Sequence, residues 1–236
     1  MRAIILAAGA GTRLSPLTNG CPKCLVPMGD RLLVDYQIEA LAAAGVDDIV
    51  LVVGYEAEQI RAHCGDGARY IDNPDYLNTN SIYSLYLARE ELDADTFLFN
   101  CDILFHPEAA VRLRDARYAN VVAIDKGVER VSGEMNVILD GEGRIRAISK
   151  ALDPEQTQAQ SAQLVRFNAE GARQVRQEIE VLMQQDQKDQ FPTSSYGPLI
   201  DQGLLYGVDI SDLPWTEIDY LADYEAAQEH VLPRLP

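Results

Sequence analysis

A glycine-rich turn near the start of the chain, Gly9-Ala10-Gly11-Thr12-Arg13, is the first segment whose residues could do chemistry. It directly follows an apolar stretch, and such a turn after a strand lets backbone N–H groups approach phosphate oxygens closely. It is not a Walker A loop, because no Gly-Lys-Ser/Thr sequence ends it. Leu14 stands where a dinucleotide-binding fingerprint has its third glycine. The segment therefore predicts a phosphate-binding loop of another kind.

The charge around this turn supports a phosphate ligand. Residues 1–29 contain no Asp or Glu, but they include Arg2, Arg13 and Lys23. The whole chain has 20 basic and 37 acidic residues, a net charge of −17, so this opening is a local exception. Because so negative a molecule repels polyanions, we expect no nucleic-acid or membrane partner and a nucleotide only at this basic segment.

Two aspartates follow strand-like segments later in the chain. Asp102 ends the apolar run 96–102, and open α/β sheets bind their ligands beyond the carboxyl ends of such strands. Asp219 ends the segment 214–219, just before a predicted helix over 220–231. Its side chain could serve a ligand or act as the N-cap of that helix.

The elements that must position these residues alternate along the chain. Strand-like apolar runs alternate with helical patterns, which predicts βα units and an α/β fold with a mixed, mostly parallel sheet flanked by helices. We expect one domain over 1–236, with a nucleotide-binding part at about 1–120 and an acceptor-binding part at about 121–236. The expected strands are 3–8, 48–54, 69–71 and 96–102, and the expected helices are 34–45, 56–63 and 78–87.

The second half of the chain has a different pattern. Segments 136–139 and 145–149 flank the turn Asp140-Gly141-Glu142-Gly143 and predict a β-hairpin. The Gln-rich segment 153–163 reads as a surface loop, and 169–185 as a long helix.

The four cysteines are too few and too irregularly spaced for a disulfide framework. Cys21 and Cys24 form a C-x-x-C pair, which leaves zinc or redox chemistry as an alternative to free thiols. A zinc site would need two more ligands, and neither Cys64 nor Cys101 belongs to a second pair. Free thiols beside Pro22-Lys23 are the simpler prediction.

The segment Leu6-Ala7-Ala8-Gly9-Ala10-Gly11-Thr12-Arg13-Leu14, followed by Pro22-Lys23, resembles the opening of the sugar-nucleotidylyltransferase-like superfamily. The resemblance implies a Rossmann-like nucleotidyltransferase fold. It also implies that the loop binds the triphosphate through Arg13 and Lys23, with Lys23 at the α-phosphate. The implied nucleotide-binding residues of the loop are Leu6, Ala8, Gly9, Gly11 and Thr12.

The same resemblance extends to the aspartates. The superfamily has a metal-binding aspartate where Asp102 stands, and its late E-I-D segment matches Glu217-Ile218-Asp219. The implied metal ligands are therefore Asp102 and Asp219. The implied cofactor is Mg²⁺, because this hard cation prefers carboxylate and phosphate oxygens.

Downstream, Asn78-Thr79-Asn80-Ser81 resembles the bacterial choline-phosphate and phosphonate cytidylyltransferases, in which such a turn meets the cytosine. Asn80 and Ser81 are the implied nucleotide contacts, with ordinary helix capping as the alternative. Glu134, Lys150 and Tyr196 are the implied acceptor-binding residues. Lys150 is the expected counter-ion of an anionic acceptor, unless it is a solvated lysine at a strand end. Met135 departs from this branch, which has a tryptophan there.

The predicted function is Mg²⁺-dependent transfer of CMP from CTP to a small phosphorylated or phosphonate acceptor, with release of pyrophosphate. A sugar-1-phosphate nucleotidylyltransferase and a non-catalytic nucleotide-sensing domain are the alternatives. No apolar run approaches the roughly 20 residues needed to cross a bilayer. We read the start of the chain as a first strand and expect a cytoplasmic protein, with a homodimer possible.

Overall fold

The apolar opening of the chain forms strand β1 (Arg2–Ala7), which pairs in parallel with β4 (Asp48–Val53) and β6 (Thr96–Asn100). Its odd-numbered apolar side chains pack into one hydrophobic cluster and its even-numbered ones into another. A strand covered on both faces needs an apolar residue at every position. The unbroken apolar run of the sequence therefore marks the middle of the fold.

The computed structural model describes all residues from Met1 to Pro236. The remaining strands are β2 (Pro27–Met28), β3 (Arg31–Leu32), β5 (Arg69–Asp72), β7 (Ile103–Phe105), β8 (Asn120–Asp125), β9 (Asn136–Leu139), β10 (Ile145–Ser149), β11 (Ala159–Phe167), β12 (Leu205–Asp209) and β13 (Trp215–Glu217). Nine strands form the main sheet in the order β10-β9-β11-β6-β1-β4-β5, with β8 on β11 and β12 on β8. Strands β6, β1, β4 and β5 run parallel, whereas β11 is antiparallel to each of its neighbours.

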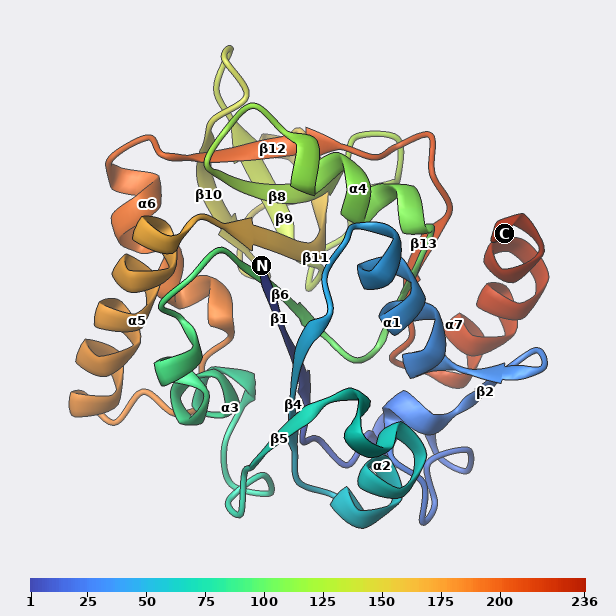
Figure 1. Ribbon diagram of the computed structural model, residues 1–236. Helices are drawn as coiled ribbons and strands as arrows, with labels where there is room; N and C mark the ends of the chain where they lie inside the picture. The colour runs from blue at the N-terminus through green and yellow to red at the C-terminus, as the bar shows by residue number, and fades with distance from the viewer.

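Helices cover both faces of this sheet (Figure 1). They are α1 (Leu33–Ala43), α2 (Ala57–Cys64), α3 (Ser81–Leu87), α4 (Pro107–Asp115), α5 (Ala169–Gln184), α6 (Gly197–Asp201) and α7 (Leu221–Ala226). Side chains of α1, α2 and α4 pack in one cluster, and side chains of α3, α5 and α6 in the other. The predicted α/β class, a mixed sheet between helices, is confirmed.

The last part of the chain returns to the first. Strand β13 pairs antiparallel with β7, directly beyond the end of β6. A third cluster joins Ile218, Ala227 and Val231 to Leu14 and Leu104. Because these apolar contacts fasten the C-terminal segment beside the glycine-rich turn, residues about 200 positions apart become neighbours (Figure 1).

Most predicted elements of the second half are confirmed. Strands β9 and β10 form the expected hairpin, and α5 matches the expected long helix. The expected surface loop over 153–163 is wrong, because β11 begins at Ala159. The buried positions in the first part of this strand are the small residues Ala159, Ser161 and Ala162, each almost completely buried. Because residues 159–163 include no β-branched residue, this part of the segment does not have the usual composition of a strand.

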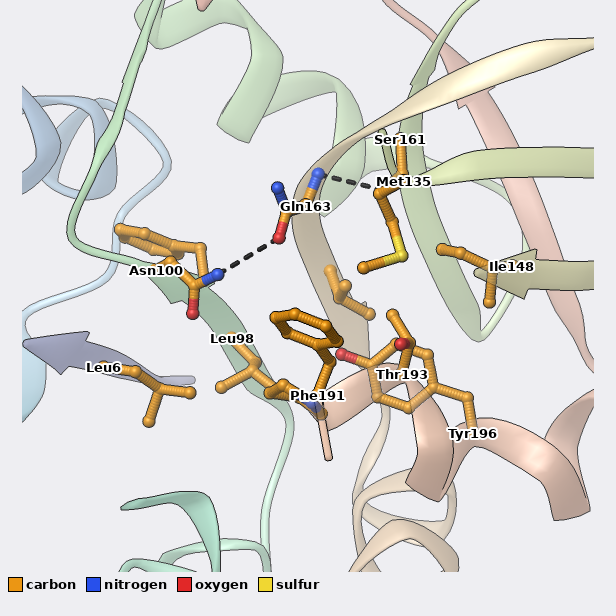
Figure 2. A pocket seen from close by; sticks show the side chains of 13 residues that line it. Leu6, Leu98, Asn100, Met135, Ile148, Ser161, Gln163, Phe191, Thr193 and Tyr196 are labelled. Carbon is orange, nitrogen blue, oxygen red and sulfur yellow. Dashed lines mark hydrogen bonds between the residues drawn. The ribbon is translucent and has the colours of Figure 1, made fainter. Parts of the chain in front are cut away.

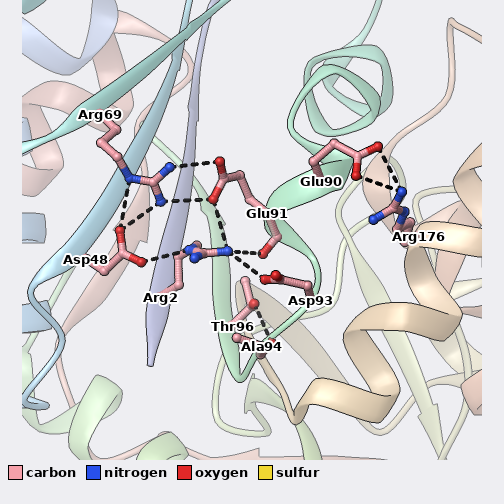
Figure 3. Close-up of polar contacts among 9 residues, drawn as sticks. All are labelled: Arg2, Asp48, Arg69, Glu90, Glu91, Asp93, Ala94, Thr96 and Arg176. Carbon is pink, nitrogen blue, oxygen red and sulfur yellow. Dashed lines mark hydrogen bonds and ion pairs between the residues drawn. The ribbon is translucent and has the colours of Figure 1, made fainter.

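Ion pairs join several elements at the end of the sheet opposite the glycine-rich turn (Figure 3). Asp48 accepts hydrogen bonds from Arg2 Nε and Arg69 Nη2, each at 2.8 Å. Glu91 pairs with the same two arginines. These contacts connect β1, β4 and β5 to the turn after α3.

None of the helices is both long enough and apolar enough to cross a membrane.

Candidate active site

The largest pocket lies beyond the carboxyl ends of β1 and β6, and it has a volume of about 420 Å³. Most of the side chains around it are polar. It is lined by the glycine-rich turn with Lys23, by the polar residues that open α3, and by the residues that follow β6. The second half of the chain contributes Gly133, Lys150, Gln163, Phe191 and Glu217. This volume is within the range of small-molecule sites. All seven nucleotide-binding residues predicted from the sequence line it, namely Leu6, Ala8, Gly9, Gly11, Thr12, Asn80 and Ser81.

Thr18 and Lys23 pack against the glycine-rich turn and hold it in place. Gly11 has a φ of 60°, in the left-handed region that favours glycine. A Cβ atom at Gly11 would lie 3.2 Å from both Lys23 Cβ and Thr18 Cγ2, and Thr18 Oγ1 donates a 2.8 Å hydrogen bond to the Gly11 carbonyl. The turn therefore packs tightly on the lysine that follows it in the sequence.

Lys23 is buried and connects the two predicted metal ligands. Its Nζ donates to Asp102 Oδ2 at 2.8 Å and to Asp219 Oδ1 at 2.7 Å. Burial alone would lower the pKa of this ammonium group, but the two carboxylates outweigh it and raise the pKa. Lys23 therefore stays protonated at the floor of the pocket.

Arg13 completes this cluster from the side of the glycine-rich turn. Its Nη2 pairs with Asp219 Oδ2 at 2.8 Å, and its guanidinium group lies 5.3 Å from the ring centroid of Tyr220. Burial acts to raise the pKa of Asp219, but Lys23 and Arg13 lower it overall, so this carboxyl is ionised. The N-cap alternative for Asp219 is wrong, because Tyr220 is the N-cap of α7 and the Asp223 carboxylate accepts hydrogen bonds from Asp219 N and Tyr220 N.

Glu217 joins the two aspartates to form a three-carboxylate cluster. One oxygen from each of Asp102, Glu217 and Asp219 lies within 4.8 Å of the others. Asp102 Oδ1 is buried and has no hydrogen-bond partner. A buried orphan oxygen beside two more carboxylates fits a divalent cation with oxygen ligands.

Sequence reasoning assigned no role to Glu217. Burial and the nearby Asp102 carboxylate raise its pKa to about 8, against the opposing charge of Lys150. The signal in the sequence was its spacing from Asp219, since residues two apart on an extended segment point the same way.

Asn80 and Ser81 open α3 at the rim of the pocket. Asn80 is the N-cap of the helix, where its Oδ1 accepts a 2.7 Å hydrogen bond from Ser81 N. Its Nδ2 donates to the Asp189 carbonyl at 3.1 Å. The capping alternative is therefore correct as geometry, and both residues also face the pocket.

The three predicted acceptor-binding residues line three different cavities. Lys150 lines the large pocket, with its Nζ 5.4 Å from the ring centroid of Phe191. Glu134 lines a separate hollow of about 310 Å³ on the other side of Glu217. Tyr196 is buried, packs against Phe167, and borders a cavity of only about 20 Å³.

Figure 2 shows the residues that line the small cavity. This cavity adjoins the large pocket, because Asn100, Gln163 and Phe191 line both. Met135 lines this small cavity. Such a cavity holds about one water molecule, so an acceptor has to lie in the larger space. The residues that sequence reasoning missed along this boundary are Asn100, Gln163 and Phe191.

All four cysteines are free thiols, as predicted. Cys24 and Cys101 are buried in the same hydrophobic cluster, next to Lys23 and Asp102 in the sequence. A hydrogen bond with Cys101, together with burial, raises the pKa of the Cys24 thiol well above its usual value. A high pKa favours the neutral thiol, which is a poor metal ligand and a poor nucleophile.

A glycine-rich turn over a buried lysine and a carboxylate cluster, at the carboxyl edge of a mixed sheet, is the architecture of a nucleotidyltransferase. The CTP:phosphocholine cytidylyltransferase from Streptococcus pneumoniae, a solved structure, superposes with a TM-score of 0.81 at 27% identity, over 97% of each chain.

Residues 3–189 match the family of MobA-like NTP transferase domains, and the chain belongs to this family. It is 31% identical over 99% of its length to the CMP-5'-(3-aminopropyl)phosphonate synthase of Streptomyces rubellomurinus, but spans only 39% of that relative. It is also 29% identical to the CTP:phosphoglutamine cytidylyltransferase of Campylobacter jejuni, over 97% of this chain and 100% of the relative.

Proposed function

We propose that this protein transfers CMP from CTP to a small phosphorylated or phosphonate acceptor, with Mg²⁺ as cofactor and pyrophosphate as the second product. The observation that carries the proposal is the Lys23 bridge between Asp102 and Asp219, directly beneath the glycine-rich turn. The choice of CTP rests on the two cytidylyltransferases and the CMP-phosphonate synthase that the chain resembles.

In the proposed reaction, an acceptor oxygen attacks the α-phosphorus of CTP. A new P–O bond forms as the bond to pyrophosphate breaks, and the electron pair leaves with pyrophosphate. Positioning and charge neutralisation are the main tasks of the protein in such a transfer. The backbone of the glycine-rich turn and Arg13 bind the β- and γ-phosphates, and Lys23 neutralises charge at the α-phosphate.

Asp102, Glu217 and Asp219 are the residues that would hold Mg²⁺. When bound, this ion would offset negative charge on the phosphates and on the acceptor. Lys23 already neutralises part of the charge of the two aspartates in the structure. The protein therefore keeps these carboxylates close together without paying the full cost of their mutual repulsion.

On the acceptor side, Lys150 is the cation that would meet an anionic phosphate or phosphonate. It is the one lysine other than Lys23 that lines the large pocket. Asn80 and Ser81 would contact the cytosine from the opposite rim. Glu134 and Tyr196 lie behind this space, so we assign them supporting roles in the acceptor wall.

The experiment that tests the proposal is an assay of pyrophosphate release in the presence of Mg²⁺. CTP, UTP, ATP and dTTP are each combined with phosphocholine, aminoethylphosphonate, 3-aminopropylphosphonate, phosphoglutamine and glucose-1-phosphate. We expect release with CTP and one of the first four acceptors. Release with glucose-1-phosphate alone would identify the sugar-phosphate alternative, and CTP binding without release under any pairing would favour the nucleotide-sensing alternative.

A further inference from the structure

Gln163 has a backbone conformation that its residue type rarely adopts. Its φ is 57°, in the left-handed region, although it lies within strand β11. The pairing of β11 with β8 shifts register between Ser161 and Val165, so the strand bulges around this residue. Backbone strain of this kind persists where the surrounding structure imposes it, and it is concentrated at functional sites.

The bulge turns the Gln163 side chain toward Asn100 (Figure 2), where it lines the large pocket. The residues before and after it, Ala162 and Leu164, are buried in the core. The backbone N–H of Gln163 donates to Ser161 Oγ at 2.9 Å, which holds the turned conformation. A strand residue in regular geometry would point to one face of the sheet. Here the strain serves to present an amide group at the sheet edge.

Both ends of that amide group are occupied. Gln163 Nε2 donates to Glu217 Oε2 at 2.5 Å, and Gln163 Oε1 accepts from Asn100 Nδ2 at 3.1 Å. Asn100 is the last residue of β6, two positions before Asp102. The side chain therefore connects one carboxylate of the cluster to the strand that leads to another.

We propose that Gln163 is a positioning residue, which orients the Glu217 carboxylate within the three-carboxylate cluster by holding it against Asn100. The amide group engages only Oε2 of Glu217 and supplies no charge of its own, so the carboxylate remains available to a cation. Groups that hold a metal-binding side chain in place typically change metal affinity or activity by about 10- to 100-fold when they are removed. The inference rests on the proposed function for its link to turnover, but its link to metal binding is independent of the acceptor.

Three variants distinguish the effect of losing the side-chain amide group from the effect of backbone strain at residue 163. Gln163→Met keeps the length of the side chain without its hydrogen bonds. Gln163→Ala and Gln163→Gly both remove the amide group, but glycine accepts the left-handed conformation and alanine does not. Mn²⁺ binding to the protein without nucleotide is measured by electron paramagnetic resonance, next to thermal unfolding, kcat and KM for CTP. Gln158→Ala is the control, because the side chain of this glutamine bonds only to the backbone of Leu139 and Gln156.

We expect all three variants to weaken Mn²⁺ binding and to lower kcat by about 10-fold, with KM for CTP changed by less than about twofold since the glycine-rich turn is untouched. The Tm of Gln163→Gly should exceed that of Gln163→Ala by about 2–4 °C. Equal losses of function at unequal stability would assign the effect to the amide group.

Wild-type Mn²⁺ affinity in Gln163→Gly and Gln163→Met would overturn the inference. It would also be overturned if function fell only in proportion to Tm, because the residue would then be purely structural. If the wild-type protein released no pyrophosphate with any pair of substrates, the proposed function would fail, while the Mn²⁺ measurements would still decide the role of Gln163.

Discussion

At the scale of single residues, Lys23 is a buried charge at the centre of the site. An ammonium group is costly to bury unless it is paired and hydrogen-bonded. Lys23 meets both conditions through Asp102 and Asp219, which lie 79 and 196 positions away in the sequence. The three side chains form one hydrogen-bonded unit, in which the two carboxylates keep the buried Lys23 charged.

Removing either end of that unit should therefore stop the reaction rather than weaken binding alone. We expect Lys23→Ala and Asp102→Ala each to lower kcat by at least about 100-fold, comparable to the loss of a key electrostatic donor in other active sites. Steady-state pyrophosphate release, with CTP and the acceptor found in the substrate screen, measures the effect.

A matched control for the lysine is Lys126→Ala. Lys126 is exposed and pairs only with Asp209, outside the pocket. Its replacement should leave kcat within about twofold of the wild-type value, as expected for a surface ion pair. Near-wild-type turnover in Lys23→Ala or in Asp102→Ala would refute the assignment of the site.

At the scale of elements, the end of β4 supports the glycine-rich turn through a close backbone contact. A Cβ atom on Gly54, just after β4, would lie 2.7 Å from the Ala8 carbonyl oxygen, which also accepts a hydrogen bond from Tyr55 N at 3.0 Å. The same atom would lie 3.0 Å from the ring of Tyr76. The backbone at Ala8 can move away from such an atom only at a large energetic cost, so an alanine at position 54 would displace the glycine-rich turn.

Gly54→Ala should therefore raise KM for CTP by about 10-fold, since overpacking typically costs about 1–3 kcal/mol. Initial rates at varied CTP concentration measure the change. Gly67→Ala is the comparison variant, because a Cβ on Gly67 would meet nothing within 4 Å. If both variants had the same KM for CTP, the contact between Gly54 and Ala8 would have no bearing on nucleotide binding.

The ion pairs around Asp48 hold the opposite end of the parallel strands and make a pH-dependent contribution to stability (Figure 3). Partial burial acts to raise the pKa of Asp48, but hydrogen bonds from Arg2 and Arg69 lower it overall. A carboxyl with a lowered pKa contributes stability above its ordinary value of about 4, and loses it as pH falls through the lower folded-state value.

Asp48→Asn should thus lower Tm by about 2–4 °C at pH 7, the effect of about 1 kcal/mol from partly exposed pairs. The difference from the wild type should close as pH falls from 5 to 3. Thermal unfolding monitored by circular dichroism across this range measures it. A difference that stayed constant down to pH 3 would exclude the ionised Asp48 carboxylate as its source.

At the scale of the whole molecule, the site joins the two ends of the chain. The turn with Arg13 and Lys23 comes from the first 25 residues, and Glu217 and Asp219 from the last 20, fastened by the third hydrophobic cluster. A ligand that contacts both segments binds the folded chain only. Its binding energy is then added to the free energy of unfolding.

CTP with Mg²⁺ should therefore stabilise the whole protein. At a ligand concentration 100 times Kd the gain is about 2.7 kcal/mol, which corresponds to a rise in Tm of about 5–10 °C for a chain of this size. Thermal unfolding with CTP, with and without EDTA, measures this gain, and EDTA should remove most of it. No shift with CTP and Mg²⁺, while the protein remains catalytically active, would contradict this account of the coupling.

The sequence by itself was enough for the local features. The turn 9–13, the β9–β10 hairpin, α5 and the capping of α3 by Asn80 are each encoded within a few consecutive residues, so composition and spacing predicted them. Arg13, Lys23, Asp102 and Asp219 could also be selected, because they stand in recognisable segments. The first part of strand β11 could not be predicted, since its buried positions hold the small residues Ala159, Ser161 and Ala162, and the glutamines between them are typical of a loop.

Only the tertiary structure decided which side chains meet. Glu217 joins the aspartates because β13 pairs with β7, and Gln163 reaches Glu217 because β11 bulges beside β6. It also separated Glu134 and Tyr196 from the pocket that Lys150 lines. Such contacts depend on the order of the strands and on the left-handed backbone conformation of Gln163, and neither produces a periodic pattern in the sequence. The sequence determines which residue types stand in each segment, whereas the distances between their side chains are set only when the sheet is assembled.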